Sequence, residues 1–86
     1  MLDEATRKTI EAKFESRELP ATAPESVWGG RSPGRPCAAC GEVIKVNHFE
    51  LETVGADRIS RYYHPECLTY ASEVRGRVQA QRANCA

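Results

Sequence analysis

Apolar residues, with one threonine among them, recur at every fourth position near the start of the chain, which is the spacing of one helix face. The residues with this spacing are Leu2, Thr6, Ile10 and Phe14. Asp3 can cap the helix and Glu4 suits its first turn. The pattern predicts an amphipathic helix over residues 3–18, inside an N-terminal segment 1–19, and Pro20 ends it. The apolar stripe is narrow, so we expect the helix to dock weakly, on the rest of the chain or on a second copy.

Residues 20–36 break the periodic pattern. They hold four of the five prolines and three of the six glycines. Such a composition predicts a Pro/Gly-rich loop rather than a helix or a central strand. Trp28 is the only tryptophan of the chain and lies in this loop. Either it packs against the domain and pins the loop, or it is an exposed contact for a partner.

Residues 37–86 predict a small α+β domain. Phe49 and Leu51 alternate with Glu50 and Glu52, as in a strand with one solvated face. A turn at residues 55–58 and a return strand at residues 59–63 complete a β-hairpin. A second helix opens with His64-Pro65-Glu66-Cys67 and runs to about Ala83. The apolar face of this helix also carries a cysteine; its members are Cys67, Ala71, Val74 and Val78.

Three cysteines and a histidine form two close pairs, C-x2-C and H-x2-C, separated by 23 residues. The residues are Cys37, Cys40, His64 and Cys67. Thiolate and imidazole are the ligands of structural zinc, and two such pairs complete a tetrahedral site. Gly41 permits the tight turn on which the first pair would lie. We therefore expect one structural Zn²⁺, which would also help so short a chain to fold.

Other roles for these residues remain open at this point. His48 is an alternative to His64 as the fourth ligand. The C-x2-C pair is also a redox motif, although the βαβ pattern of thioredoxin-like proteins is missing. The cysteines could instead be ordinary buried residues. Cys85, next to last in the chain, is expected to be a free thiol.

Charge and hydropathy narrow the choice of partners. Formal net charge is zero and the isoelectric point is about 6.7, which argues against a strong general attraction to nucleic acid or to an acidic membrane. The N-terminal stretch is charged throughout and lacks the apolar core of a secretory signal, and no run reaches transmembrane length. We expect a cytoplasmic protein, a monomer or weak homodimer without a membrane partner.

The predicted elements are a zinc knuckle at the first ligand pair, a β-hairpin, and a helix with two ligands at its start. This order resembles that of treble-clef zinc fingers. Within that group the chain resembles the first half of a LIM domain over residues 37–67, with the four ligands named above in the matching positions. A LIM domain continues into a second finger, which this chain lacks, so the resemblance implies protein docking only weakly. The Leu-Pro, Trp-Gly-Gly and C-x2-C-G stretches of residues 19–41 also look like a group of small uncharacterised bacterial proteins.

Two functions follow as expectations. The first is a zinc-stabilised interaction module that binds another protein in a regulatory role, with Trp28, Arg31 and Arg35 as contacts. The second is a nucleic-acid-binding zinc finger. Its basic residues are scattered rather than gathered in a stripe; they are Arg31, Arg35, Lys45, Arg75, Arg77 and Arg82. An enzyme is not expected, because Glu66, the one carboxylate between the second pair of ligands, suits a helix N-terminus.

Overall fold

The computed structural model describes residues 2–84, so the expectation for Cys85 lies outside the described residues. Helix α1 spans Glu4–Glu15, and the Asp3 side chain accepts a hydrogen bond of 2.8 Å from the backbone N–H of Thr6, as expected for its cap. The helix ends earlier than predicted. Arg17 adopts a left-handed conformation, with φ of 67°, and this turns the chain away before Pro20 is reached.

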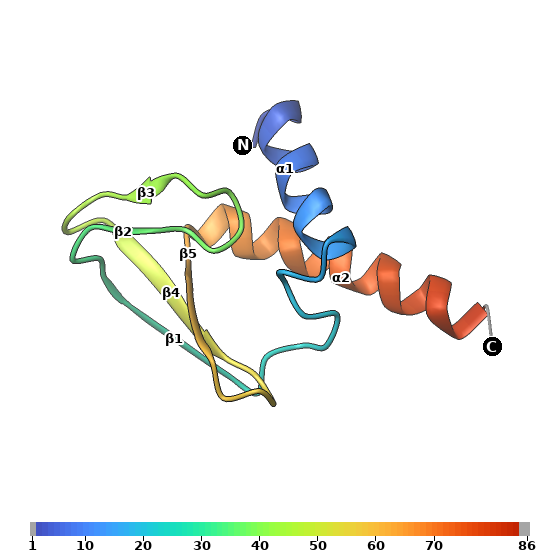
Figure 1. Ribbon diagram of the computed structural model, residues 1–86. Helices are drawn as coiled ribbons and strands as arrows, with labels where there is room; N and C mark the ends of the chain where they lie inside the picture. The colour runs from blue at the N-terminus through green and yellow to red at the C-terminus, as the bar shows by residue number, and fades with distance from the viewer. Residues whose placement is uncertain (1, 85–86) are drawn as a thin grey trace.

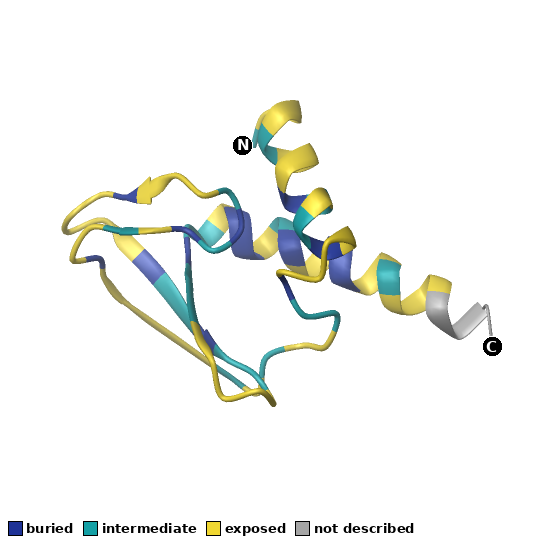
Figure 2. Ribbon diagram, viewed as in Figure 1, coloured by how far each residue is buried: buried dark blue, intermediate teal, exposed yellow. Residues whose placement is uncertain are grey.

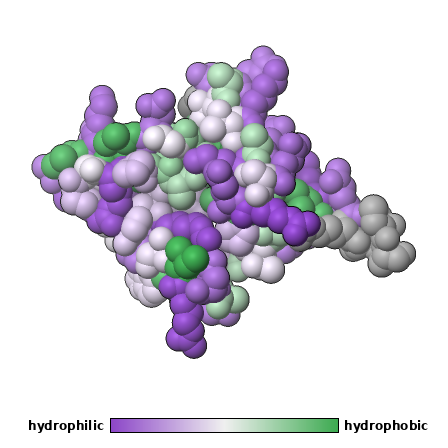
Figure 3. Space-filling view, in the orientation of Figure 1, coloured by the Kyte–Doolittle hydropathy of each residue, from purple (hydrophilic) through white to green (hydrophobic). Residues whose placement is uncertain are grey.

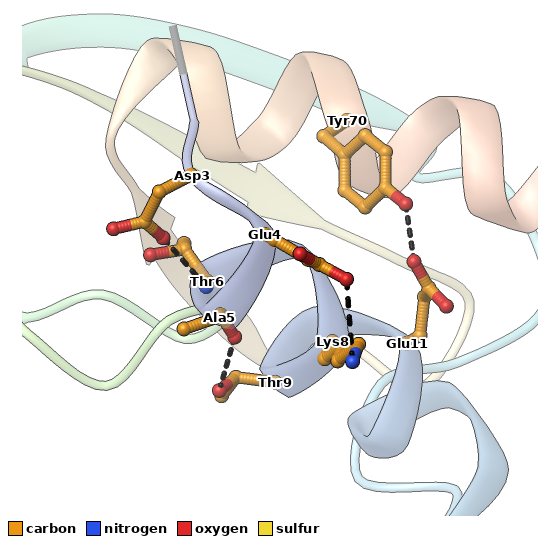
Figure 4. A network of polar contacts seen from close by, with 8 residues as sticks. All are labelled: Asp3, Glu4, Ala5, Thr6, Lys8, Thr9, Glu11 and Tyr70. Carbon is orange, nitrogen blue, oxygen red and sulfur yellow. Dashed lines mark hydrogen bonds and ion pairs between the residues drawn. The ribbon is translucent and has the colours of Figure 1, made fainter.

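The narrow apolar face of α1 docks on the rest of the chain. Ile10 and Phe14 are buried, and α1 packs across the second helix, α2, which spans Pro65–Asn84 (Figures 1 and 2). Tyr70 of α2 donates a hydrogen bond to the Glu11 carboxylate on α1 (Figure 4). Lys13 of α1 also donates a hydrogen bond of 3.0 Å from Nζ to the carbonyl oxygen of Ala38. The first helix is therefore part of the domain and not a separate arm.

The β-structure consists of a three-stranded antiparallel sheet and a separate two-stranded ladder. The sheet has the order β1-β4-β5, with β1 at Ser26–Arg31, β4 at Phe49–Val54 and β5 at Ser60–Tyr63. The ladder pairs β2, Arg35–Pro36, with β3, Val43–Ile44. The β4–β5 hairpin is confirmed, and its turn is closed by a 2.9 Å hydrogen bond from the N–H of Arg58 to the carbonyl of Gly55.

The prediction of a loop over residues 20–36 is wrong for its middle part, because residues 26–31 form β1. Pro24 and Pro33 lie outside this strand, so every residue within it keeps its backbone N–H. Backbone pairing with β4 runs from Ser26 opposite Val54 to Arg31 opposite Phe49. The predicted exclusion of a central strand holds, since β1 is an outer strand.

Both faces of β4 are covered, so its buried and exposed residues differ from those that the sequence pattern predicts. Tyr63 and Thr53 are buried on the face that α2 covers. Glu50 lies on the opposite face and is only 6% exposed, whereas Phe49 lies on the same face as Thr53 and is 56% exposed. The strand was predicted correctly, but the prediction of buried Phe49 and solvated Glu50 is wrong. Helix α2 does not extend over Phe49, and the β2–β3 ladder lies beside Glu50.

The hydrophobic core lies where the two helices, the first ligand pair and β5 meet. Its largest fully buried side chains are Tyr63, Ile10, Ile44, Cys37 and Cys67. The predicted face of α2 is confirmed, since Cys67, Ala71 and Val74 are buried and Val78 packs against the same cluster. Two of the predicted metal ligands therefore belong to the core. The visible surface is mostly polar, with hydrophobic residues in separate patches (Figure 3).

Candidate metal centre

The first ligand pair lies on a tight turn between β2 and β3. The N–H of Gly41 donates to the carbonyl of Cys37 at 2.9 Å, and the N–H of Cys37 donates to the carbonyl of Glu42 at 2.8 Å. Gly41 has φ of 81°, a conformation that glycine adopts without steric cost. The predicted role of this glycine is confirmed. The turn places Cys37 and Cys40 on the same side of the ladder.

The second ligand pair lies at the junction of β5 and α2. His64 follows the last residue of β5, and its carbonyl accepts a 3.0 Å hydrogen bond from the N–H of Leu68 as the helix starts. Pro65 is the first residue of α2, where its missing N–H costs nothing. A 2.7 Å hydrogen bond from the N–H of Ala38 to the carbonyl of Tyr62 ties the turn of the first pair to β5. This backbone contact brings the two pairs together.

The four predicted ligands form one cluster. One donor atom from each of Cys37, Cys40, His64 and Cys67 lies within 4.8 Å of every other. His64 Nδ1 lies 3.5 Å from Cys40 Sγ and 3.8 Å from Cys67 Sγ. With Zn–S bonds of about 2.3 Å and Zn–N bonds of about 2.0–2.1 Å, the edges of a tetrahedral site are roughly 3.5–3.8 Å long. The cluster therefore has the size and the donors to hold a metal ion.

The thiols of the cluster titrate as a group. A hydrogen bond from Cys67 stabilises the Cys37 thiolate and lowers the pKa of Cys37 to about 4, with help from the backbone N–H groups of Cys40, His64 and Ala39. The same hydrogen bond, together with burial, raises the pKa of Cys67. Burial raises the pKa of Cys40. Without a metal ion, the site thus favours one thiolate beside two thiols. A bound cation would stabilise all three sulfurs as thiolates.

The alternatives to this ligand set fit less well. His48 is exposed in the bend that joins β3 to β4, and it is not part of the cluster. The C-x2-C pair lies on a turn between two short strands, not at the start of a helix as in redox proteins. The three described cysteines are unpaired. The structure therefore favours His64 over His48 and a metal site over a disulfide.

The residues predicted to contact a partner lie in different surroundings. Trp28 is 53% exposed on the outer strand, so the expectation that it pins the loop is wrong. Arg31 is exposed and donates a 3.2 Å hydrogen bond from Nη1 to the carbonyl of Asn47. Arg35 turns inward. Its Cζ lies 3.7 Å from the centre of the Tyr62 ring, and its Nε lies 3.4 Å from Oε1 of Glu50.

The buried ion pair between Arg35 and Glu50 was not expected from the sequence. The side chain of Glu50 is 8% exposed and that of Arg35 is 33% exposed. The two facing atoms are at ion-pair distance but do not form a hydrogen bond. The alternation of polar and apolar residues in β4 placed Glu50 in solvent, and no local signal in the sequence reveals the ladder that covers it. The pair holds β2, the strand before the first ligands, against the sheet.

No protein-family model, curated protein or solved structure matches the chain. Among the described residues, neither helix combines the length and the apolar character needed to cross a bilayer. The site itself is therefore the strongest indication of function.

Proposed function

We propose that the chain is a structural-zinc module of the treble-clef type that binds another protein in a regulatory role. The observation that carries the proposal is the closed Cys₃His cluster. Its ligands come from a turn, and from the junction of a hairpin strand with a helix, in the order that treble-clef domains use. Four protein ligands fill a tetrahedral site and leave no position for substrate, so the ion would serve the fold.

The donor set favours zinc over other metals. Three sulfurs and one imidazole nitrogen suit zinc, whereas magnesium and calcium prefer oxygen ligands. We propose one Zn²⁺ per chain, held by Cys37, Cys40, His64 and Cys67. Three cysteines without a disulfide also suit a reducing compartment such as the cytoplasm.

Binding to a protein is favoured by the surface around β1. Trp28 presents a large aromatic side chain to solvent, and tryptophan is enriched among the residues that dominate the energy of interfaces. Val27 and Phe49 are also more than half exposed. A partner would bury these side chains, so apolar burial would supply most of the binding energy.

Two other functions have less support. Arg75 is 6% exposed and its Cζ lies 5.9 Å from the centre of the Phe14 ring, so Arg75 and Arg35 are withdrawn from any basic surface. The side chain of Arg82 lies outside the described residues. Arg31, Lys45 and Arg77 remain exposed on separate elements. We also propose no catalytic role, since Glu66 occupies the first turn of α2 as a helix N-terminal acid.

Titration with random duplex and single-stranded oligonucleotides tests the nucleic-acid alternative. At physiological salt we expect no submicromolar binding, because the exposed basic side chains lie on separate elements and do not form one stripe along which a phosphate backbone could run. Each neutralised phosphate would steepen the salt dependence by about 0.9 log units of affinity per log unit of salt. Submicromolar binding that disappears in an Arg31→Ala/Lys45→Ala variant, but persists in Trp28→Ala, would overturn the protein-binding proposal.

A further inference from the structure

The outer edge of β1 is open. Within residues 2–84, β1 forms a ladder with β4 alone, and Val27 to Arg31 are all exposed (Figures 1 and 2). Ser32, which continues the strand, donates a 2.8 Å hydrogen bond from its N–H to the carbonyl of His48. Backbone groups alternate in direction along an antiparallel ladder. Even-numbered residues of β1 therefore face β4, and Val27, Gly29 and Arg31 direct their N–H and C=O groups outward.

The sequence of β1 lacks most of the features that protect outer strands from pairing. Natural outer strands are commonly protected by proline, lysine, a bulge or short length. β1 has six residues, contains no proline or lysine and follows a regular register. It ends in Arg31, its one charged residue. An additional strand could therefore form hydrogen bonds along its whole length.

Apolar side chains flank the open edge on both faces of the sheet. Val27, Gly29 and Phe49 share one face, because Val27 pairs with Thr53 and Arg31 pairs with Phe49. The Phe49 ring lies over Gly29, since a Cβ atom at position 29 would be 2.5 Å from its Cζ. Trp28 lies on the opposite face. Exposure of Val27, Trp28 and Phe49 is 51%, 53% and 56%, respectively.

The strand is complementary to a second copy of itself in one register. A two-fold axis must pair odd-numbered residues with odd-numbered residues, because these carry the outward backbone groups. With the axis at Trp28, Val27 pairs with Gly29 of the second copy and lies against its Phe49 ring. Glu25 precedes β1 and donates a 2.9 Å hydrogen bond from its N–H to the carbonyl of Val54, so it adds no outward N–H group. In this register it still lies beside Arg31 of the second copy at both ends of the interface, where the two side chains have opposite charges. An axis at Gly29 would instead place Val27 opposite Arg31, and an axis at Val27 would place Glu25 opposite Gly29. Neither of these registers brings opposite charges together.

We propose that the chain forms a homodimer in which β1 pairs antiparallel with β1 of a second copy, across a two-fold axis at Trp28. The two three-stranded sheets become one six-stranded sheet. The inference deepens the proposed function and rests on it, because it names a second copy as the protein that the exposed Trp28 contacts. One short strand from each copy buries less surface than most stable interfaces, so we expect a weak and reversible dimer.

Charge reversal tests the register. Sedimentation equilibrium of the zinc-loaded full chain should show a monomer–dimer equilibrium between micromolar and millimolar concentrations. Glu25→Arg and Arg31→Glu, made separately, each place like charges opposite one another twice per dimer. Each should weaken self-association about tenfold. An equimolar mixture of the two single variants should dimerise about as well as the original chain, because every facing pair then has opposite charges.

A chain that stays monomeric at millimolar concentration overturns the inference, and so does a dimer that charge reversal leaves unchanged. Glu15→Arg is the matched control, because it reverses the charge of an exposed residue on α1, a helix that packs on α2, and it should leave dimerisation unchanged. A monomer whose binding to a different protein depends on Trp28 would overturn this inference and leave the proposed function standing. A charge-dependent dimer that contains no zinc would contradict the proposed function alone.

Discussion

Chelation of zinc is expected to unfold residues 37–80. Structural zinc supplies roughly 10–16 kcal/mol of apparent binding free energy in finger peptides, which exceeds what a core of this size provides. Cys37 and Cys67 are themselves core residues, so losing the ion would remove the bonds that join the two ligand pairs and leave a thiolate inside the core. The dispersed amide NMR spectrum should collapse on chelation at neutral pH, and also in acid, where protons compete with the ion for thiolate and imidazole.

Single substitutions locate this effect. Native mass spectrometry should find one zinc per chain, and Cys67→Ser should weaken its binding sharply. Cys85→Ser is the matched control for the loss of a thiol, and His48→Ala against His64→Ala identifies the histidine ligand. A spectrum that stays dispersed after zinc loss has been verified would refute the dependence of the fold on metal. Equal zinc loss in the two histidine variants would refute the ligand set.

Arg35→Ala is expected to lower the free energy of unfolding of the zinc-loaded protein by about 3 kcal/mol. Removing one partner of a buried ion pair costs about 3–5 kcal/mol because the other charge stays buried without compensation. The lower end applies here because the Arg35 side chain is 33% exposed. The substitution also removes the guanidinium from the face of the Tyr62 ring. Urea unfolding at saturating zinc measures the difference.

Two control variants separate the effect of breaking the ion pair from the effect of removing an arginine side chain as such. Arg31→Ala removes an exposed arginine near the same sheet and should change the unfolding free energy by less than about 0.5 kcal/mol. Arg35→Met combined with Glu50→Leu replaces both charges by apolar groups and should recover most of the loss. Equal small effects of Arg35→Ala and Arg31→Ala would show that the ion pair contributes nothing to stability.

The ligand set, the hairpin and α2 could be predicted from sequence because each depends on local spacing. Cys37 and Cys40 need only a turn, and Cys67 lies on the face of α2 that periodicity already marks as buried. Strand β1 could not be predicted in this way. Its Trp-Gly-Gly core has no alternation of polar and apolar residues. The segment is a strand because its backbone pairs with β4.

The two residues whose burial was predicted wrongly have a common cause. Phe49 and Glu50 lie on a strand whose environment changes along its length, since α2 covers one part of it and the β2–β3 ladder covers another. A strand pattern predicts alternation but cannot say which face is covered at each position. The inward turn of Arg35 toward Glu50 follows from the same packing, which depends on residues distant in sequence.

The spacing of the ligands has a consequence for the order in which the chain folds. Cys40 and His64 are 24 residues apart, and the whole β4–β5 hairpin lies in the loop between them. An ion that joins the two pairs would shorten the search for the hairpin, since closing a loop reduces the entropy that later contacts must overcome. Strand β1 and helix α1 lie outside this loop. We therefore expect metal capture and hairpin formation to be one kinetic event, with the N-terminal third of the chain added afterwards. The transition state should then have high φ-values at Leu51 and low ones at Ile10.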